Sequence, residues 1–243
     1  MKVIGLIPAR YKSSRFPGKP LVSILGVPMI IRVCQIAEQA LGKENVYVAT
    51  EDLRIFDLVQ EYGYNSVMTS DEHKTGTDRI AEVAAMIDAD IYINIQGDEP
   101  MLDPNDIIII MNEKINNYNY VINGTTYISE SEDPYSVNIP KVLVNKENEL
   151  IYMSRLSIPG IKGSDEKPKY LKQVCIYAFN KDELSIYRDN PEKTYYESFE
   201  DIEILRFLDF GKKIKMVHLN TFSLAVDVPE DVLKVEKALE KNG

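Results

Sequence analysis

Cysteine and histidine are scarce in this sequence of 243 residues. Cys34 and Cys175 are the two cysteines, too few for a disulfide framework or a cysteine-rich zinc site. Both lie in apolar surroundings, which is typical of buried free thiols in a reducing compartment. His73 and His218 are too scattered for a histidine metal cluster. The sequence therefore excludes the common cysteine and histidine metal centres.

Long apolar runs are also absent. Val3–Ile7 is cut off by Pro8, and Ile107–Met111 is equally short. A membrane-spanning helix needs about 20 apolar residues, and the core of a signal peptide needs about 7 to 15. We therefore expect a cytoplasmic protein without a membrane segment.

Acidic residues are missing from the start of the chain, because no Asp or Glu occurs before Glu38. The whole chain nevertheless has a formal charge of −10. Proteins usually meet nucleic acids and anionic membranes with a net basic face, so neither is expected as a partner. Six cations in the first 37 residues of an acidic chain instead favour one site for a small anionic ligand.

Strand and helix patterns alternate four times in the first 100 residues. Strands are expected at 3–7, 46–49, 65–68 and 90–95, with helices opening at Pro28, at Asp52 and before Ile80. This alternation predicts an α/β fold with a doubly wound, mostly parallel sheet.

The pattern changes after about residue 120. The expected elements are strands at 121–128, 138–144, 150–153, 173–179 and 213–219, with helices from Asp103-Pro104, at 197–210 and at 229–241. Residues 160–168 form a polar loop. No linker or repeat interrupts the chain, so we expect one domain, 1–243, with an elaborated second half.

The loop Pro8–Lys19 follows the first strand and holds four cations and two hydroxyls. In parallel sheets, ligands bind beyond the carboxyl ends of the strands, where this loop lies. Arg10 and Arg15 could bind phosphate through bidentate pairs, and Lys19 as a point charge. Pro20 and a missing upstream glycine exclude a Walker A motif. The alternative is a solvated basic loop.

Two carboxylates have positions suited to a metal. Asp98, in Gln96-Gly-Asp-Glu-Pro100, follows the strand at 90–95 and lies at the same edge of the sheet. Magnesium binds oxygen ligands, so Asp98 is suited to hold it. An ordinary turn at the entry to a helix fits this segment equally well. Glu230 and Asp231 are explained by the favourable position of carboxylates at the amino end of the last helix. Asp227 is expected to end a strand just before that helix, which leaves it freer to reach a metal.

The turn Thr75–Arg79 opens the helix that contains Ile80. Its backbone N–H groups could contact a nucleotide, and a plain helix cap is about equally consistent with the residues.

These segments, in this order and spacing, resemble the CMP-Kdo synthetases (3-deoxy-manno-octulosonate cytidylyltransferases) over nearly the whole chain. Ile7–Leu21 resembles the opening run of that family, and Gln96–Pro100 matches its second motif fully. Gly76-Thr77 with Arg79, Ser154-Arg155 with Ile158-Pro159, and Asp227 match three further family segments.

The resemblance implies a Rossmann-like nucleotidyltransferase of the nucleotide-diphospho-sugar transferase type. Such an enzyme transfers CMP from CTP to the anomeric hydroxyl of a sugar acid and releases pyrophosphate, for lipopolysaccharide or surface-glycan synthesis. Residues 1–100 would form the nucleotide-binding half. Residues 101–243 would bind the acceptor and build a homodimer.

The resemblance also assigns individual residues. Catalytic roles fall to Asp98, Lys19 and Arg10, and Asp98 with Asp227 would bind Mg²⁺. Nucleotide contacts are expected from Pro8, Ala9, Arg10, Ser13, Arg15, Lys19, Gly76, Thr77, Arg79, Gln96 and Asp98. Acceptor contacts are expected from Arg155, Gln173, Tyr177, Glu203 and Ile204, with Arg155 facing the sugar carboxylate.

The sequence departs from the family pattern in the acceptor half. Gln173, Cys175, Ile204 and Val228 stand where the family usually has His, Gly, Gln and Thr. A site that binds substrate hydroxyls discriminates through such polar groups. The resemblance as a whole implies Kdo or a close analogue as the acceptor, and these departures favour an altered Kdo, such as an amino or deoxy form. The alternatives are another small acid (8-amino-Kdo, a nonulosonate or a phosphonate) and a non-catalytic nucleotide-binding relative.

Overall fold

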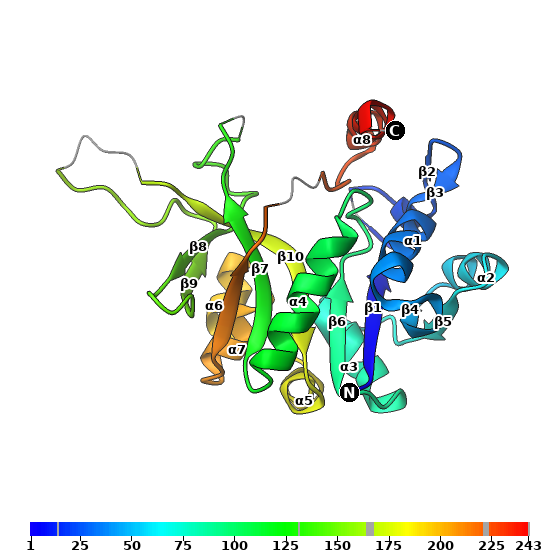
Figure 1. Ribbon diagram of the computed structural model, residues 1–243, viewed down its shortest axis with the longest axis horizontal. Coiled ribbons are helices and arrows are strands. Elements are labelled where there is room, and N and C mark those ends of the chain that lie inside the picture. The colour runs from blue at the N-terminus through cyan, green and yellow to red at the C-terminus, as the bar shows by residue number, and fades with distance from the viewer. Residues whose placement is uncertain (14, 131, 164–167, 221–223, 243) are drawn as a thin grey trace.

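The protein is built around one nine-stranded sheet, shown in Figure 1. The computed structural model describes residues 1–13, 15–130, 132–163, 168–220 and 224–242. The main strand order is β11-β7-β10-β6-β1-β4-β5, with β8 and β9 paired beside β10. Its strands are β1 (Val3–Ala9), β4 (Val46–Thr50), β5 (Asn65–Met68), β6 (Ile91–Ile95), β7 (Val121–Tyr127), β8 (Lys141–Val144), β9 (Leu150–Ser154), β10 (Leu171–Phe179) and β11 (Ile214–His218).

Helices cover both faces of the sheet. On one face lie α1 (Met29–Leu41), α2 (Leu53–Glu61) and α4 (Pro104–Asn116), and on the other α3 (Gly76–Met86), α5 (Lys181–Asp189) and α7 (Leu205–Asp209). Strand residues alternate between the two cores, as Ile91 and Ile93 face one and Tyr92 the other. The expected doubly wound, mostly parallel α/β fold is confirmed.

The strand order reverses at β1. The chain builds β4 and β5 on one side of β1 and then returns to place β6 on its other side. The helices that follow β1 and β5, α1 and α3, therefore lie on opposite faces. Crevices at such switch points, beyond the carboxyl ends of the strands, are the usual ligand sites of this architecture.

The second half enters the sheet through β10. This strand lies between β6 and β7 and pairs antiparallel with both. Its register with β7 shifts between Val174 and Tyr177, so β10 carries a bulge there. The buried Asn123 amide donates to the carbonyls of Val174 and Ile176, both at 2.9 Å, and stabilises the bulge.

Two expectations about the second half were wrong, and one helix was missed. The helix expected at 197–210 is two helices, α6 (Tyr195–Glu200) and α7, because Asp201 adopts a left-handed conformation with φ 51°. Helix α5 was not expected, although Asn180 and Glu183 form a capping box at its start. Asp227 does not end a strand. Residues 164–167 of the expected polar loop lie outside the described residues.

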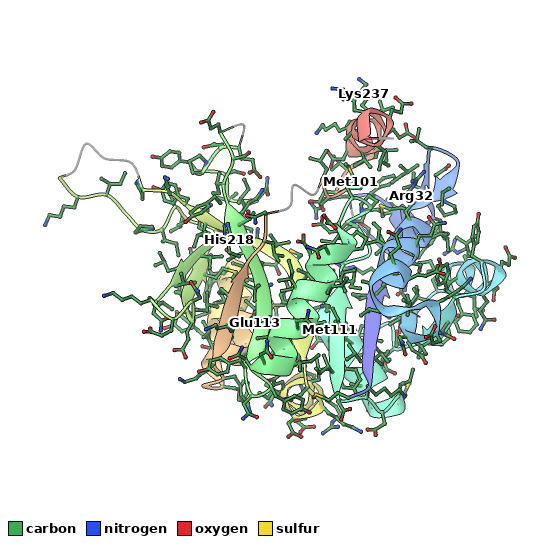
Figure 2. The ribbon with its side chains drawn as sticks, in the orientation of Figure 1. Arg32, Met101, Met111, Glu113, His218 and Lys237 are labelled. Atoms are coloured by element: carbon green, nitrogen blue, oxygen red, sulfur yellow. The ribbon has the colours of Figure 1, made fainter. Side chains whose placement is uncertain are left out.

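The last helix, α8 (Pro229–Asn242), packs against the start of the chain. Val235 is buried with Ile24 of the hairpin β2 (Ser23–Ile24)–β3 (Val27–Pro28), and Met101 packs beside them. Figure 2 shows Met101 near this contact and Lys237 on the outer side of α8. The segment before α8 thereby reaches the switch point. No described helix is long and apolar enough to cross a membrane.

Candidate active site

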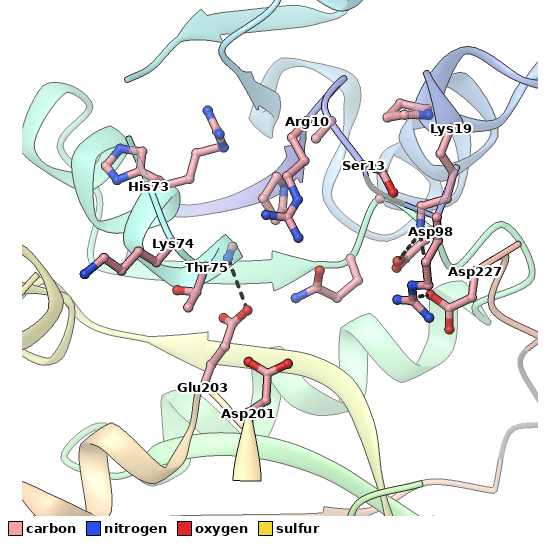
Figure 3. A pocket seen from close by; sticks show the side chains of 18 of the residues that line it. Arg10, Ser13, Lys19, His73, Lys74, Thr75, Asp98, Asp201, Glu203 and Asp227 are labelled. Carbon is pink, nitrogen blue, oxygen red and sulfur yellow. Dashed lines mark hydrogen bonds and ion pairs between the residues drawn. The ribbon is translucent and has the colours of Figure 1, made fainter. Parts of the chain in front are cut away.

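A cavity of about 250 Å³ opens at the switch point. Figure 3 shows that charged side chains point into it from both halves of the chain. Its lining residues are Pro8, Ala9, Arg10, Ser13, Arg15, Lys19, Pro20, His73, Lys74, Thr75, Gly76, Arg79, Gln96, Gly97, Asp98, Lys193, Asp201, Glu203 and Asp227. The β1 loop, the β6 loop and the segment before α8 thus meet at one place.

Lys19 lies between the two candidate metal carboxylates. Its Nζ donates to Asp98 Oδ2 at 2.7 Å and to the Val226 carbonyl at 2.8 Å, and lies 3.8 Å from Asp227 Oδ1. The Val226 N–H donates to the Asp98 carbonyl, which ties the segment before α8 to the β6 loop. Lys19, Asp98 and Asp227, which are far apart in the sequence, are therefore joined as one charged cluster.

The Asp98–Asp227 pair fits a divalent cation. Carboxylate oxygens are the donors that Mg²⁺ prefers, and a protein ammonium already lies between the two groups. No group of three or more acidic, histidine or cysteine ligands occurs among the described residues. Magnesium sites of phosphoryl-transfer enzymes typically use one or two carboxylates and complete the coordination with water and substrate phosphates.

The two arginines of the β1 loop differ in their partners. Arg15 Nη2 lies 3.0 Å from Asp227 Oδ1. Arg10 lines the cavity and forms no ion pair with any described residue. Figure 3 shows its guanidinium over the middle of the cavity. An exposed guanidinium there is suited to bidentate contact with a phosphate.

The loop is anchored by a buried ion pair. Glu51, after β4, accepts the Tyr11 N–H at 2.9 Å and lies 3.1 Å from Arg79 Nη2. Arg79 is 4% exposed and also donates to Thr69 and to the Ser70 carbonyl. Burial lowers the pKa of Arg79, while the charge of Glu51 raises it. Arg79 therefore lines the cavity but directs most of its hydrogen bonds into the protein.

The amino end of α3 is capped by Glu203. Its carboxylate accepts the N–H groups of Gly76 at 3.1 Å and Thr77 at 3.0 Å, and the Thr77 hydroxyl at 2.5 Å. Burial raises the pKa of Glu203, while these hydrogen bonds act to lower it. The N–H groups expected to contact a nucleotide are thus engaged by Glu203, and Thr77 is buried behind Gly76.

Most of the expected acceptor residues do not line the cavity. Glu203 does, whereas the described residues that line the cavity do not include Arg155, Gln173, Tyr177 or Ile204. Tyr177 and Ile204 are buried. Gln173 Nε2 donates to Asn123 and to the Tyr177 hydroxyl, within the sheet.

Seven lining residues were not among the site residues expected from the sequence: Pro20, His73, Lys74, Thr75, Gly97, Lys193 and Asp201. Five of them lie within or next to the segments Ile7–Leu21, Thr75–Arg79 and Gln96–Pro100, so these segments were recognised but not their full contribution to the cavity. Lys193 and Asp201 flank α6 and carry no motif. Only the fold brings them to the cavity.

Comparisons with known proteins agree with this geometry. The family model for cytidylyltransferases matches residues 4–214. An Escherichia coli 3-deoxy-manno-octulosonate cytidylyltransferase is 38% identical over 96% of this chain and 94% of its own length. A Shewanella frigidimarina 8-amino-3,8-dideoxy-manno-octulosonate cytidylyltransferase is 39% identical over 98% and 99%.

A solved structure extends the likeness to three dimensions. The structure of a CMP:2-keto-3-deoxy-manno-octonic acid synthetase complexed with CTP has a TM-score of 0.92 and 38% identity. The alignment covers 100% of both chains. The architecture around the cavity is therefore shared with a protein that holds a nucleotide.

Proposed function

The chain belongs to the CMP-Kdo synthetase family of cytidylyltransferases, and from that premise we propose that it transfers CMP from CTP to 3-deoxy-manno-octulosonate or a close analogue. The observation that carries the proposal is the cluster of Lys19, Asp98 and Asp227 beside Arg10 in one cavity. It combines cations for a triphosphate with carboxylates for a metal.

The reaction forms a bond between the anomeric oxygen of the acceptor and the α-phosphorus of CTP. The bond from that phosphorus to pyrophosphate breaks, and the hydroxyl proton is lost. Positioning and charge neutralisation supply most of the rate in such transfers. In this chain Arg10, Arg15 and Lys19 hold the phosphates, and Pro8 and Ala9 line the same cavity.

Magnesium is part of the proposal. Asp98 and Asp227 would hold it, and when bound it supplies charge neutralisation at the phosphates and a lower pKa for the attacking hydroxyl. Lys19 then has two functions: it keeps the carboxylates together before the nucleotide binds, and it donates to phosphate oxygens afterwards.

The test is pyrophosphate release with Mg²⁺, crossing CTP and UTP with Kdo and related acids. We expect CTP and Kdo, or one of its close analogues, to be turned over. Asp98→Asn should lower the rate by about 100-fold or more, because it removes a charge that acts on the metal and the phosphates. Asp103→Asn is the matched control, since Asp103 caps α4 outside the cavity. Retained activity in Asp98→Asn would refute the metal role.

An amino-sugar acid is a second candidate acceptor. Asp201 lines the cavity with a side chain that is 72% exposed, and its carboxylate already pairs with the ammonium group of Lys193, so it could also accept an ammonium of the acceptor. The similarity to an 8-amino-3,8-dideoxy-manno-octulosonate cytidylyltransferase supports this candidate. If it is correct, 8-amino-Kdo is used more efficiently than Kdo, and Asp201→Asn raises KM for the amino compound. Better use of Kdo by the wild-type protein would exclude it.

We also propose one domain, 1–243, that works as a cytoplasmic homodimer. The insertion of β10 between β6 and β7 supports a single domain, since both halves share one sheet. The free thiols Cys34 and Cys175 support a reducing compartment. Exposed apolar side chains in the second half, Tyr135 and Leu156 among them, support a dimer surface there.

A further inference from the structure

The main chain of Tyr11 is the point at which the β1 loop is fixed to the rest of the protein. Its N–H donates to Glu51 Oε1 at 2.9 Å, and its carbonyl accepts the Gly18 N–H at 2.9 Å. Arg10 directly precedes Tyr11, and Lys19 directly follows Gly18. Two cations of the proposed phosphate site are therefore each next to a residue that these hydrogen bonds hold.

The ring of Tyr11 is also held in place. The Arg54 guanidinium of α2 lies 3.3 Å from the centre of the ring, and it donates to the Asp52 carboxylate at 2.8 and 2.7 Å. On Gly18, whose φ is 71°, a Cβ would lie 3.1 Å from the Tyr11 ring. A shift of the Tyr11 main chain would therefore disturb its contacts with Arg54 and Gly18 as well.

Glu51 is fixed in turn by Arg79. Glu51 directly follows β4, its side chain is 7% exposed, and its Oε2 lies 3.1 Å from Arg79 Nη2. Arg79 lies in the first turn of α3 and also donates to Thr69 and to the Ser70 carbonyl, which follow β5. One buried ion pair therefore joins the loops after β1, β4 and β5 to the start of α3.

Glu51 can influence a ligand only through the residues that it holds. Neither Glu51 nor Tyr11 is among the described residues that line the cavity, whereas Arg10 and Lys19 are. Arg10 forms no ion pair with any described residue, and Figure 3 shows its guanidinium over the middle of the cavity. The direction of Arg10 therefore depends on the main chain on either side of it, which is β1 and Tyr11.

We propose that Glu51 is a positioning residue of the nucleotide site. By accepting the Tyr11 N–H, it holds the β1 loop in the conformation that presents Arg10 and Lys19 to the triphosphate. This rests on the proposed function, which supplies CTP as the ligand. Cations that are already in place stabilise the charge of the phosphates without a rearrangement during the reaction. A loop without this anchor must be ordered when CTP binds, which weakens binding.

The first test is the Kd for CTP, measured by titration calorimetry with Mg²⁺ and without an acceptor. In Glu51→Ala it should rise about 10- to 100-fold, the range for one lost charge-assisted contact, because Arg10 is no longer aimed at a phosphate. Glu51→Gln keeps an oxygen that can accept the Tyr11 N–H and should retain most of the affinity. Both variants lose the negative charge beside Arg79, so a role confined to the ion pair predicts equal effects.

Glu183→Ala is the matched control. Like Glu51, Glu183 is a buried glutamate that accepts a backbone N–H, from Asn180 at 2.8 Å, and pairs with a buried cation, Lys114, at 2.7 Å. Glu183 is not among the described residues that line the cavity. Its loss should lower the midpoint of thermal unfolding and leave the Kd for CTP unchanged.

The second test is a double-variant cycle with Arg10. Arg10→Met alone should raise the Kd for CTP. Adding Glu51→Ala in that background should raise it by less than Glu51→Ala does in the wild-type background, because residues that act through one another couple, whereas independent effects add. The effect that remains in this background belongs to Lys19.

The third test needs no variant. In the wild-type protein without nucleotide, the Tyr11 amide should already be protected from hydrogen exchange, because its N–H is bonded to a buried carboxylate. Exchange as fast as that of a free loop, with protection only after CTP is added, would show that Glu51 does not hold the loop beforehand.

The outcomes separate the two levels of inference. An unchanged Kd for CTP in Glu51→Ala, equal effects of Glu51→Ala and Glu51→Gln, or additivity with Arg10→Met overturns the positioning role. If the wild-type protein binds no CTP, the proposed function itself fails, whatever the variants do. If CTP binds with the expected pattern and no sugar acid is turned over, the role of Glu51 is supported and the proposed acceptor is rejected.

Discussion

Buried charge is concentrated on Arg206. Its guanidinium is fully buried, donates twice to Glu197 at 2.7 Å and once to Asp78 at 2.8 Å, and lies 3.9 Å from the centre of the Tyr187 ring. Asp78 also belongs to the capping box of α3. One side chain of α7 therefore connects α6 to the helix whose first residue lines the cavity.

Replacing Arg206 by Met should be strongly destabilising. The carboxylates of Glu197 and Asp78 would stay buried without their partner, and breaking such an arrangement costs about 3–5 kcal/mol. Urea denaturation measures the loss. Arg188→Met is the matched control, because Arg188 is an exposed arginine paired with its neighbour Asp189 and should change stability by less than about 0.5 kcal/mol. Equal midpoints for both variants would contradict this account.

The loop after β6 closely approaches the end of β1 at Gly97. A Cβ on Gly97 would lie 2.9 Å from the Pro8 carbonyl oxygen and 3.4 Å from Ile30 Cδ1. The loop that carries Asp98 can therefore approach the loop that carries Arg10 only because residue 97 has no side chain. We expect this contact to set the spacing between the candidate metal carboxylate and the proposed phosphate-binding loop.

Gly97→Ala should separate the loops and lower kcat/KM for CTP by about 10- to 100-fold, since small displacements of catalytic groups are costly. Steady-state pyrophosphate release measures the change. Gly160→Ala is the control, because nothing lies within 4 Å of a Cβ at Gly160. Similar kinetics for the two variants would show that the Gly97 contact does not set the geometry of the site.

On the scale of the whole molecule, several large apolar side chains of the second half are exposed at the surface. In the second half, Tyr127, Tyr135, Leu156 and Ile161 leave between 46% and 69% of their surface exposed. Tyr127, Tyr135 and Ile161 line one broad depression. An apolar surface of this kind, away from the cavity, is typical of contact with another protein chain.

The proposed homodimer predicts a solution mass of about twice 27.7 kDa, as measured by light scattering or sedimentation. Leu156→Glu should shift the protein to the monomer, because a charge would enter an apolar contact. Leu53→Glu, at a residue of similar exposure on α2, should leave the mass unchanged. A monomeric wild-type protein would reject the dimer.

The sequence by itself determined the first half of the fold, residues 1–100. The spacing of apolar residues predicted the strands β1, β4, β5 and β6 and the helices that follow them. The bounds of β5 are the expected ones, 65–68. Parallel strand topology predicted that the loops carrying Arg10 and Asp98 lie at one edge of the sheet, because parallel strands have their carboxyl ends at the same edge. These features depend on residues that are close together in the sequence, so they can be predicted without coordinates.

Only the tertiary structure decided which residues of the second half reach the cavity. The left-handed Asp201 splits an apparently continuous helix, and the surrounding backbone engages Arg155 while Lys193 lines the cavity. Asp227 reaches Lys19 because α8 packs on the first hairpin, more than 200 residues away in sequence. Such contacts join distant residues through packing and backbone hydrogen bonds. The family resemblance singled out Asp227 and Arg155, but no periodicity or motif of the chain encodes these contacts.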